Sequence, residues 1–452
     1  MKNKPFIHLD TPEAGLVGTE SIYPRPQLRR DSFFSLDGNW EFSARPQGME
    51  PDFSKLIRVP FPPESALSRI CEVFPDGTAL CYRRHFSLPR DFCRGRVILH
   101  IGAADQVAKV WLNGHYLGEH RGGYLPFSFD ATDCVRQESN TLFVQVTDDL
   151  DTHILPWGKQ KHKRGGMWYT PVSGIWQSCW LESVPEIYVR SLQIKADDKG
   201  ATICADGVDE GMVIVTTPEG LTCTKMRQGV AHIAIDKPRL WSPEDPYLYR
   251  FKLCCGEDTV HSYFACRTVG VGKVDGVPRI LLNGKPYFFH GLLDQGYFPD
   301  GIYTPAHPYA YVRDILLAKS LYRRFFTNEV ACCTWLFLTS AVGAVLLFFL
   351  YDVNAVAVIL LMTLVSGLQG GINLMLISYV PKRFQPYGTV STVTGLLDAF
   401  AYAGSAISTY VVAVIAERLG WGFTVGTWAV IAVLGTLACL AAVKPWRRFF
   451  EK

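Results

Sequence analysis

Two hydrophobic patterns divide the chain. Over residues 25–287, short runs of β-branched and aromatic residues alternate with Gly, Pro, Asn and Asp, which is typical of antiparallel strands joined by turns. This part lacks the long 3.6-residue periodicity of amphipathic helices. Over residues 330–443 the pattern changes to long apolar runs with few charges. The chain is therefore expected to join an all-β soluble part to an α-helical membrane part.

Two short motifs in the first part predict hairpins. In KVWLNGHYLG, Asn113 and Gly114 lie between apolar runs, and RILLNGKPYFF repeats the arrangement at Asn283 and Gly284. Asn-Gly tolerates the positive φ angles of a two-residue turn that matches strand twist. One large and one smaller β-sandwich is the simplest architecture for such a series of strands.

The second part contains four apolar segments, each longer than the roughly 20 residues that span a bilayer. They cover residues 330–351, 354–380, 389–416 and 423–443. We expect residues 323–452 to form four transmembrane helices in a lipid bilayer.

Basic residues lie at alternate ends of these segments. Lys382 and Arg383 occupy the second break, and Lys444 and Arg447 follow the last segment, whereas the first break has no basic residue. The positive-inside rule then places both ends of the membrane part on the cytoplasmic side. The N-terminus MKNKPFIHLDTPEAG has no apolar stretch of the secretory type. These patterns predict a multi-pass protein of a bacterial-type inner or plasma membrane, with its β domains in the cytoplasm.

Charge and cysteine content exclude several classes of partner. The net charge of +3 is small and its basic residues are scattered, so no nucleic-acid partner is expected. The 13 cysteines form no C-x-x-C pair and no zinc-type spacing. We expect reduced, mostly buried thiols, no metal and no cofactor. The patterns predict no particular oligomeric state.

Six motifs in order along the β part resemble family 2 glycoside hydrolases, the group of β-galactosidases and β-glucuronidases that hydrolyse O-glycosyl bonds. They are LDGNWEF (36–42), VPFPPES (59–65), VWLNGHYLGEHRGGYLPFSFD (110–130), WYTPVSGIWQSCWLE (168–182), LWSPEDPYLY (240–249) and RTVGV (267–271). The resemblance implies a jelly-roll sugar-binding domain at 1–184 and an immunoglobulin-like sandwich at 185–272. It also implies that 273–322 is the first strand and helix of an incomplete TIM barrel. A barrel needs about eight strand and helix pairs to close, so the remnant at 279–321 is expected to be poorly packed or to sit loosely on the sandwich.

Aromatic rings suit the apolar faces of sugars, although tryptophans in a sandwich usually belong to its core. Trp176 and Trp180 are accordingly expected in the core, whereas Trp168 follows Gly-Gly-Met on a predicted loop. The basic run KQKHKRGG and the passage HGLLDQGYFPDGIYTPA (290–306) supply further candidates. The candidate carbohydrate contacts are Lys159, Trp168, Tyr169, Asp294, Gln295 and Tyr297.

Glycoside hydrolysis requires two carboxyl groups across the scissile bond. In the resembling family both are glutamates on late barrel strands, but after His290 this chain has only Glu329, Glu417 and Glu451. Asn328-Glu329 matches the family's dipeptide but adjoins the apolar part. We therefore expect no catalytic residue and an inactive lone chain. The substitute acids Asp294, Asp300 and Asp314 are a weaker alternative, since none has a partner base.

The membrane part resembles the last four helices of a major facilitator superfamily transporter of the sugar-phosphate antiporter branch. SGLQGGINLMLISYVPKRF and GTVSTVTGLLDAFAYAGSAISTYVVAVIAERLGW carry this resemblance. A carboxylate inside an apolar helix is a functional candidate, so Asp398, with Gln369 and Asn373 as polar partners, is the candidate transporter site. Four helices supply neither half of such a transporter, so we expect an anchor without transport.

The two resemblances meet at about residues 321–327, which suggests a gene fusion. Three function classes follow. The favoured one is a non-catalytic carbohydrate-binding β-sandwich tethered to the membrane. The second is a β-glycosidase of carbohydrate metabolism whose missing barrel comes from elsewhere. The third is a truncated transporter with a glycosidase-derived passenger, and a fusion or assembly artefact is the remaining alternative.

Overall fold

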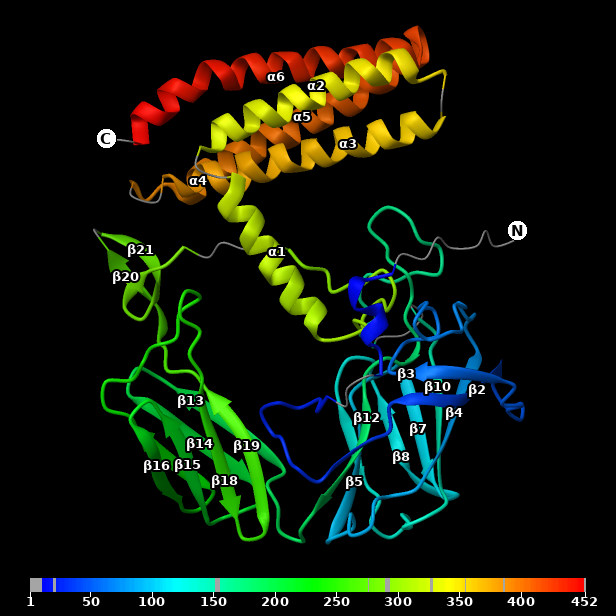
Figure 1. Ribbon diagram of the computed structural model, residues 1–452. Coiled ribbons are helices and arrows are strands. Elements are labelled where there is room, and N and C mark those ends of the chain that lie inside the picture. The colour runs from blue at the N-terminus through cyan, green and yellow to red at the C-terminus, as the bar shows by residue number, and fades with distance from the viewer. Residues whose placement is uncertain are drawn as a thin grey trace. The chain divides into compact units, whose positions relative to one another are not determined.

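The computed structural model describes residues 10–18, 22–150, 155–274, 276–288, 293–325, 328–353, 355–384 and 387–450. The chain divides into two compact units. The β-rich unit comprises Met1–Gly270, Leu281–Lys285 and Leu293–Arg313, and the helical unit comprises Val271–Ile280, Pro286–Leu292 and Asp314–Lys452. Figure 1 shows the strands and helices that make them up.

The first β-sandwich packs two antiparallel sheets, with strand orders β3-β2-β4-β10-β7-β8 and β1-β12-β5-β9, and a short β6–β11 pair. Alternate residues of β10, Leu142, Val144 and Val146, are buried in its core with Trp40 and Tyr82. This two-residue period is the one expected of half-buried strands. The elements are the 3-10 helix η1 (Pro12–Leu16), β1 (Phe33–Ser35), β2 (Gly38–Pro46), β3 (Lys55–Val59), β4 (Thr78–Phe86), β5 (Arg96–Ile101), β6 (Ala104–Asp105), β7 (Val107–Leu112), β8 (His115–Arg121), β9 (Phe127–Asp130), β10 (Asn140–Thr147), β11 (Gly174–Ile175) and β12 (Cys179–Val184).

The second β-sandwich packs β13-β14-β17 against β16-β15-β18-β19. Tyr249, Phe251 and Leu253 of β18 enter its core, and Leu28 from the N-terminal segment joins them. A separate small sheet has the order β20-β21-β22. The strands are β13 (Ser191–Ala196), β14 (Gly200–Asp206), β15 (Gly211–Thr217), β16 (Gly220–Met226), β17 (Val230–Ala234), β18 (Tyr249–Cys255), β19 (Asp258–Phe264), β20 (Val269–Val274), β21 (Val277–Leu282) and β22 (Lys285–Pro286).

Both predicted hairpins are confirmed. Asn113 and Gly114 join β7 to β8 with φ angles of 52° and 83°, and Asn283 and Gly284 join β21 to β22 with 53° and 73°. These positive angles explain why Asn and Gly occupy the two positions. The β-rich fold of this part is therefore as expected.

Among the described residues of the second unit, four helices are long and apolar enough to cross a membrane, by length and composition. The first three follow the predicted segments, but the last continues through Pro445 to Phe450, beyond the predicted end at 443. The run of apolar residues shows only which part of the helix suits lipid. Helical backbone hydrogen bonding continues beyond that run, through the charged residues that follow it. The helices are α1 (Tyr309–Phe325), α2 (Glu329–Leu350), α3 (Ala355–Leu374) with the π-helical η2 (Met375–Tyr379), α4 (Val380–Lys382), α5 (Val390–Leu419) and α6 (Trp421–Phe450).

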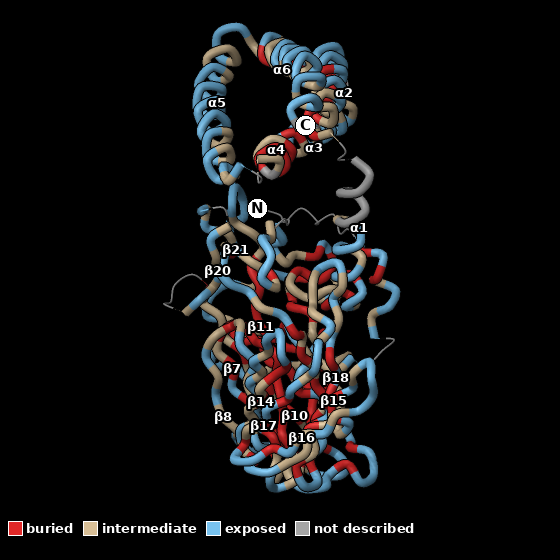
Figure 2. The backbone as a smooth tube through the Cα atoms, turned by 90° about the vertical axis from the view of Figure 1, so that its left-hand side faces the viewer, coloured by how far each residue is buried: buried red, intermediate tan, exposed pale blue. Residues whose placement is uncertain are grey.

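Within this unit α2 packs against α3 and α6, while α5 contacts α6 more sparsely. Figure 2 shows α5 exposed along most of its length, and no residue of the apolar window of α5 is buried. In lipid such a face requires no protein cover, because hydrocarbon is as apolar as the side chains.

The predicted loose packing of the barrel remnant is wrong for residues 298–306. Phe298, Asp300 and Ile302 are buried, and Phe298 and Ile302 form an isolated β-bridge. His290, Gly291 and Leu292 of the predicted first strand lie outside the described residues, and residues 293–308 contain no strand. The predicted helix is present as α1, with Ile315, Leu316 and Leu317 exposed.

All 13 cysteines are free, but only five of them are buried. Six are half-buried, and Cys93 and Cys223 are exposed. The expectation of mostly buried thiols is thus too strong, because several cysteines lie on strands whose outer face meets solvent.

Candidate functional site

An aromatic cluster connects the first sandwich to the passage around residue 300. Tyr303 lies between Tyr124 and Tyr297, with hydroxyl oxygens 3.5 Å and 3.2 Å away. Its ring is 5.1 Å from that of Trp176, and the Tyr297 ring stacks on Tyr169 with centroids 4.3 Å apart. Burial is the main reason that the pKa values of Tyr297 and Tyr303 are raised, so these hydroxyl groups remain protonated hydrogen-bond donors.

Gln160 connects the basic run KQKHKRGG (159–166) to this aromatic cluster by hydrogen bonds. Its Nε2 donates to the Tyr124 hydroxyl at 2.8 Å, and its Oε1 accepts from the Val172 amide at 2.6 Å. The side chain is fully buried, although it lies within a run of lysines and histidine. No pattern in the sequence distinguishes Gln160 from its solvated neighbours.

Three of the predicted carbohydrate contacts lie together. Tyr169 stacks on Tyr297, and the Tyr169 amide donates to the Lys159 carbonyl at 2.8 Å. Lys159 is exposed, and both tyrosines are half-buried. One face of each ring is covered by the other ring, the Tyr297 hydroxyl donates to the Tyr303 hydroxyl, and the Lys159 side chain is exposed.

None of the described side-chain contacts joins the other three predicted contacts to this group. The Trp168 ring stacks on Trp157 at 5.5 Å and has the Lys161 ammonium 4.5 Å from its centroid. Asp294 is exposed and accepts from the Gly296 amide at 2.7 Å. Gln295 is also exposed. The structure therefore groups Lys159, Tyr169 and Tyr297, but not all six.

The core predictions for two tryptophans are confirmed. Trp176 and Trp180 have exposed fractions of 9% and 2%. Trp176 Nε1 donates to the Gly123 carbonyl at 2.8 Å, so its polar atom is satisfied inside the protein. These rings are unavailable for stacking on a sugar.

Three carboxyl groups lie near the aromatic cluster: Asp105 is buried, and Glu64 and Asp148 are half-buried. Burial raises the pKa of Glu64 to about 8 and that of Asp148 to about 6. Burial, followed by the charge of Asp148, raises the pKa of Asp105 well above its ordinary range. Glu64 and Asp148 line a cavity of about 10 Å³. This volume holds at most one water molecule, so these carboxyl groups cannot reach a glycosidic bond there.

The Asp105 carboxyl group lies so close to position 123 that only glycine fits there without a clash. A Cβ atom on Gly123 would lie 2.2 Å from Asp105 Oδ1 and 2.4 Å from its Cγ. We expect Gly123→Ala to lower the free energy of unfolding of the β-rich unit by about 1–3 kcal/mol, as overpacking does. Urea unfolding followed by tryptophan fluorescence measures this. Gly270→Ala is the matched control, since its Cβ would meet nothing within 4 Å, and equal losses for the two variants would contradict the clash.

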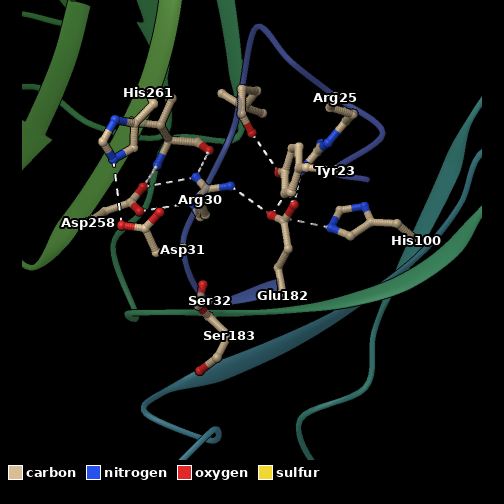
Figure 3. Close-up of polar contacts among 12 residues, drawn as sticks. Tyr23, Arg25, Arg30, Asp31, Ser32, His100, Glu182, Ser183, Asp258 and His261 are labelled. Carbon is tan, nitrogen blue, oxygen red and sulfur yellow. Dashed lines mark hydrogen bonds and ion pairs between the residues drawn. The ribbon is translucent and has the colours of Figure 1, made fainter. Parts of the chain in front are cut away.

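Figure 3 shows a buried ionic network in the β-rich unit. Arg30 Nη1 donates to Glu182 at 2.9 Å, and its Nε and Nη2 donate to the two oxygens of Asp258 at 2.9 Å each. Arg25 Nη2 also donates to both Glu182 oxygens, at 2.8 and 2.9 Å. Arg30, Glu182 and Asp258 are 4%, 1% and 3% exposed. The N-terminal segment thereby links β12 of the first sandwich to β19 of the second.

The network holds Glu182 ionised. Burial alone would raise the pKa of Glu182, but neighbouring His100 and Arg25 outweigh it and hold this pKa well below its ordinary range. Burial lowers the pKa of His100, whose ring stacks on Trp180 at 4.9 Å. A permanently charged, fully paired carboxylate is a poor proton donor. We therefore assign this network a structural role.

Asn328 and Glu329 belong to the end of a helix. Asn328 Oδ1 accepts from the Ala331 amide at 2.9 Å and caps α2. Buried Glu329 accepts from Arg383 Nε at 2.8 Å and Trp446 Nε1 at 3.1 Å. A helix cap, an ion pair with Arg383 at the end of α4 and a hydrogen bond from Trp446 of α6 account for both residues without catalysis.

The candidate transporter residues are not brought together. Gln369 and Asn373 are exposed on α3, and Asp398 is half-buried on α5. None of the described hydrogen bonds joins Asp398 to either residue. Helix α3 packs on α2, whereas α5 contacts α6, α4 and η2, which continues from α3. Their role in transport stays a prediction. Among the described residues, no group of three or more His, Cys, Asp or Glu could hold a metal ion.

Comparison with known proteins covers the β-rich part. Residues 52–185 match the sugar binding domain of glycosyl hydrolases family 2, and residues 189–270 match a further domain described as glycosyl hydrolases family 2. A β-galactosidase from Thermoanaerobacter pseudethanolicus is 29% identical over 244 residues, which is 48% of this chain and 32% of that protein. A β-glucuronidase from Paenibacillus borealis is 25% identical over 304 residues, 60% of this chain and 50% of that protein.

Solved structures show the same fold. A β-glucuronidase from Faecalibacterium prausnitzii has a TM-score of 0.53 at 24% identity, covering 66% of this chain and 56% of its own. One from Ruminococcus gnavus, in complex with an N1-substituted uronic isofagomine, has a TM-score of 0.52 at 22% identity, with 65% and 56% covered. The chain spans half the length or less of the curated relatives named above. Over residues 52–185 and 189–270, its β-rich part is therefore similar to two domains of glycosyl hydrolases family 2.

Proposed function

We propose that this protein is a non-catalytic carbohydrate-binding module tethered to a membrane. The observation that carries the proposal is the match of residues 52–185 to a sugar binding domain, within which Tyr169 lies beside Lys159. The second matched domain continues the same family likeness to residue 270. The apolar helices α2, α3, α5 and α6 follow, each long enough to cross a membrane.

The ligand class follows from the relatives and from the site. The matched relatives are named β-galactosidase and β-glucuronidase, so the proposed ligand is a β-galactoside or a β-glucuronide. Tyr169 and Tyr297 present ring edges and hydroxyl groups, which suit the alternating C–H and O–H groups of a pyranose. The exposed Lys159 ammonium group suits the carboxylate of a glucuronide.

The tether is the set of four apolar helices. Each is long enough to cross a bilayer. The basic residues near the ends of the set favour cytoplasmic β domains. Derivation of these helices from a major facilitator superfamily transporter is part of the same proposal, supported by the sequence pattern alone. Carbonate washing of membranes should leave the protein in the pellet, and its release into the wash would contradict the tether.

Binding of methyl β-D-glucuronide and methyl β-D-galactoside to the full chain in detergent tests the proposed function. We expect Lys159→Met to weaken glucuronide binding by about tenfold, or about 1.4 kcal/mol, and to leave galactoside binding unchanged. Tyr169→Ala should weaken both. Isothermal titration calorimetry or saturation-transfer NMR measures these affinities.

Lys225→Met is the matched control, because Lys225 is an exposed lysine of β16 in the second sandwich. It should bind both sugars like the wild type. Absence of wild-type binding to either sugar at millimolar concentration, or equal losses for Lys159→Met and Lys225→Met, would contradict the proposal.

A further inference from the structure

A groove of about 1130 Å³ lies on the outer face of the second sandwich, between the N-terminal segment (22–33) and the sheet β16-β15-β18-β19. Strand register places its floor: Lys252 of β18 lies between Ile214 of β15 and His261 of β19. Buried and exposed residues alternate along β18, so the exposed set faces away from the sandwich core and into this groove.

The floor of the groove carries positive charge without a partner. Arg250 and Lys252 are exposed, and none of the hydrogen bonds or ion pairs among the described residues engages either side chain. Arg29 adds a third cation, whereas Asp31 is the one carboxylate among the described lining residues. Asp31 lies 4.0 Å from Arg29 and 3.7 Å from His261. Its charge is thus offset locally, and the charges of Arg250 and Lys252 stay uncompensated.

Hydroxyl and apolar groups accompany these cations. Tyr263 is half-buried and lies beside Arg250 in the register of β18 and β19, and Thr216 of β15 is exposed. Leu221 and Leu248 are exposed apolar side chains of the same lining. A groove of this composition suits a ligand that combines carboxylates, hydroxyl groups and C–H faces.

The edge of β19 is closed to an added peptide strand at this groove. The Arg29 amide donates to the His261 carbonyl at 3.0 Å, and the His261 amide donates to the Arg29 carbonyl at 2.8 Å. A peptide that extends a sheet needs such backbone groups to be free. Single-stranded nucleic acid needs exposed rings on which its bases stack, and no ring among the described lining residues is exposed. These observations favour an anionic sugar.

We propose that this groove binds anionic oligosaccharides through the carboxylates of their uronic-acid units. Arg250 holds a carboxylate with two parallel N–H groups, and Lys252 adds a point charge. The two residues lie roughly 7 Å apart along β18, by the rise of an antiparallel strand, so they reach the same or a neighbouring sugar unit. Neither Lys159 nor Tyr169 lines the groove, so this site does not depend on the proposed function.

Binding of hexagalacturonate to the full chain in detergent tests the site. The fully methyl-esterified hexasaccharide is the matched ligand, because it keeps the sugar chain and loses the carboxylate charges. We expect the acid form to bind at least about tenfold more tightly than the ester. Its affinity should also fall as sodium chloride is raised, because salt screens exposed charges. Isothermal titration calorimetry measures both affinities.

Arg250→Gln and Lys252→Gln should each weaken binding of the acid form by about tenfold, the effect of losing one charge-assisted contact. Both side chains are exposed, so both variants should unfold at the urea concentration of the wild type. Lys195→Gln is the matched control, because Lys195 is an exposed lysine of β13 in the opposite sheet of the same sandwich. It should bind like the wild type.

Equal affinities for the acid and the ester, or no binding of either at millimolar concentration, would overturn the proposal. Equal losses in Lys252→Gln and Lys195→Gln would do so too, and equally tight binding of hexaglutamate would overturn the assignment to a sugar. A loss in Lys159→Met with none in Arg250→Gln would place the binding elsewhere. Failure to bind methyl β-D-glucuronide and methyl β-D-galactoside, with intact binding of hexagalacturonate that Arg250→Gln weakens, would overturn only the proposed function.

Discussion

Replacing Arg30 by alanine is expected to lower the free energy of unfolding of the β-rich unit by about 3–5 kcal/mol. Arg30 is 4% exposed and donates to both Glu182 and Asp258. Without it, Asp258 keeps only its bond from the Val189 amide, at 2.9 Å. Uncompensated buried charge costs far more than an exposed ion pair contributes, so this change should rank among the most damaging in the unit.

Urea unfolding followed by tryptophan fluorescence measures this loss, since Trp180 lies within the network. Lys55→Ala is the matched control, because Lys55 pairs with Glu72 at 2.6 Å while both side chains are over 40% exposed. Such exposed pairs contribute at most about 1 kcal/mol. Similar losses in Arg30→Ala and Lys55→Ala would contradict a structural role for the network.

The full chain is expected to hydrolyse neither 4-nitrophenyl β-D-galactoside nor 4-nitrophenyl β-D-glucuronide above the rate in buffer. Glycosidases need two carboxyl groups about 5–9 Å apart across the bond, and enzymes that possess such machinery accelerate reactions by at least about 10⁶-fold. Here Glu329 is engaged by Arg383 and Trp446 at the start of α2, and Glu417 lies near the end of α5. Buried Asp300 accepts from the amide and hydroxyl of Thr11, so it serves to hold the N-terminal segment.

Release of 4-nitrophenol by the purified chain measures this activity. A rate that disappears in Glu329→Gln or Asp300→Asn but persists in Glu41→Gln would contradict the expectation. A rate that persists in all three would point to a contaminating glycosidase from the expression host, and purification from a host lacking such enzymes should then remove it.

The local pattern of polar, apolar and turn-forming residues accounts for the strands, turns and helices of this protein. Alternation predicted strands such as β10 and β18, Asn-Gly pairs predicted the turns at 113–114 and 283–284, and apolar runs predicted α2, α3, α5 and α6. These features depend on backbone preference and on side-chain period, which operate over a few residues. The likeness to sugar binding domains could also be predicted, because its motifs are continuous in the sequence.

Only the tertiary structure determines which polar residues are buried and which residues they contact. Gln160, Asp105 and Arg30 look like ordinary polar residues in the sequence, yet each is nearly inaccessible and is held by contacts from distant strands or segments. It also decided that Tyr169 meets Tyr297, that Asp398 does not meet Gln369 or Asn373, and that residues 298–306 are packed. The reason is physical: the cost of burying a polar group is offset only by partners far away in the chain. A sequence determines its periodicity locally, whereas those partners exist only once the chain has folded.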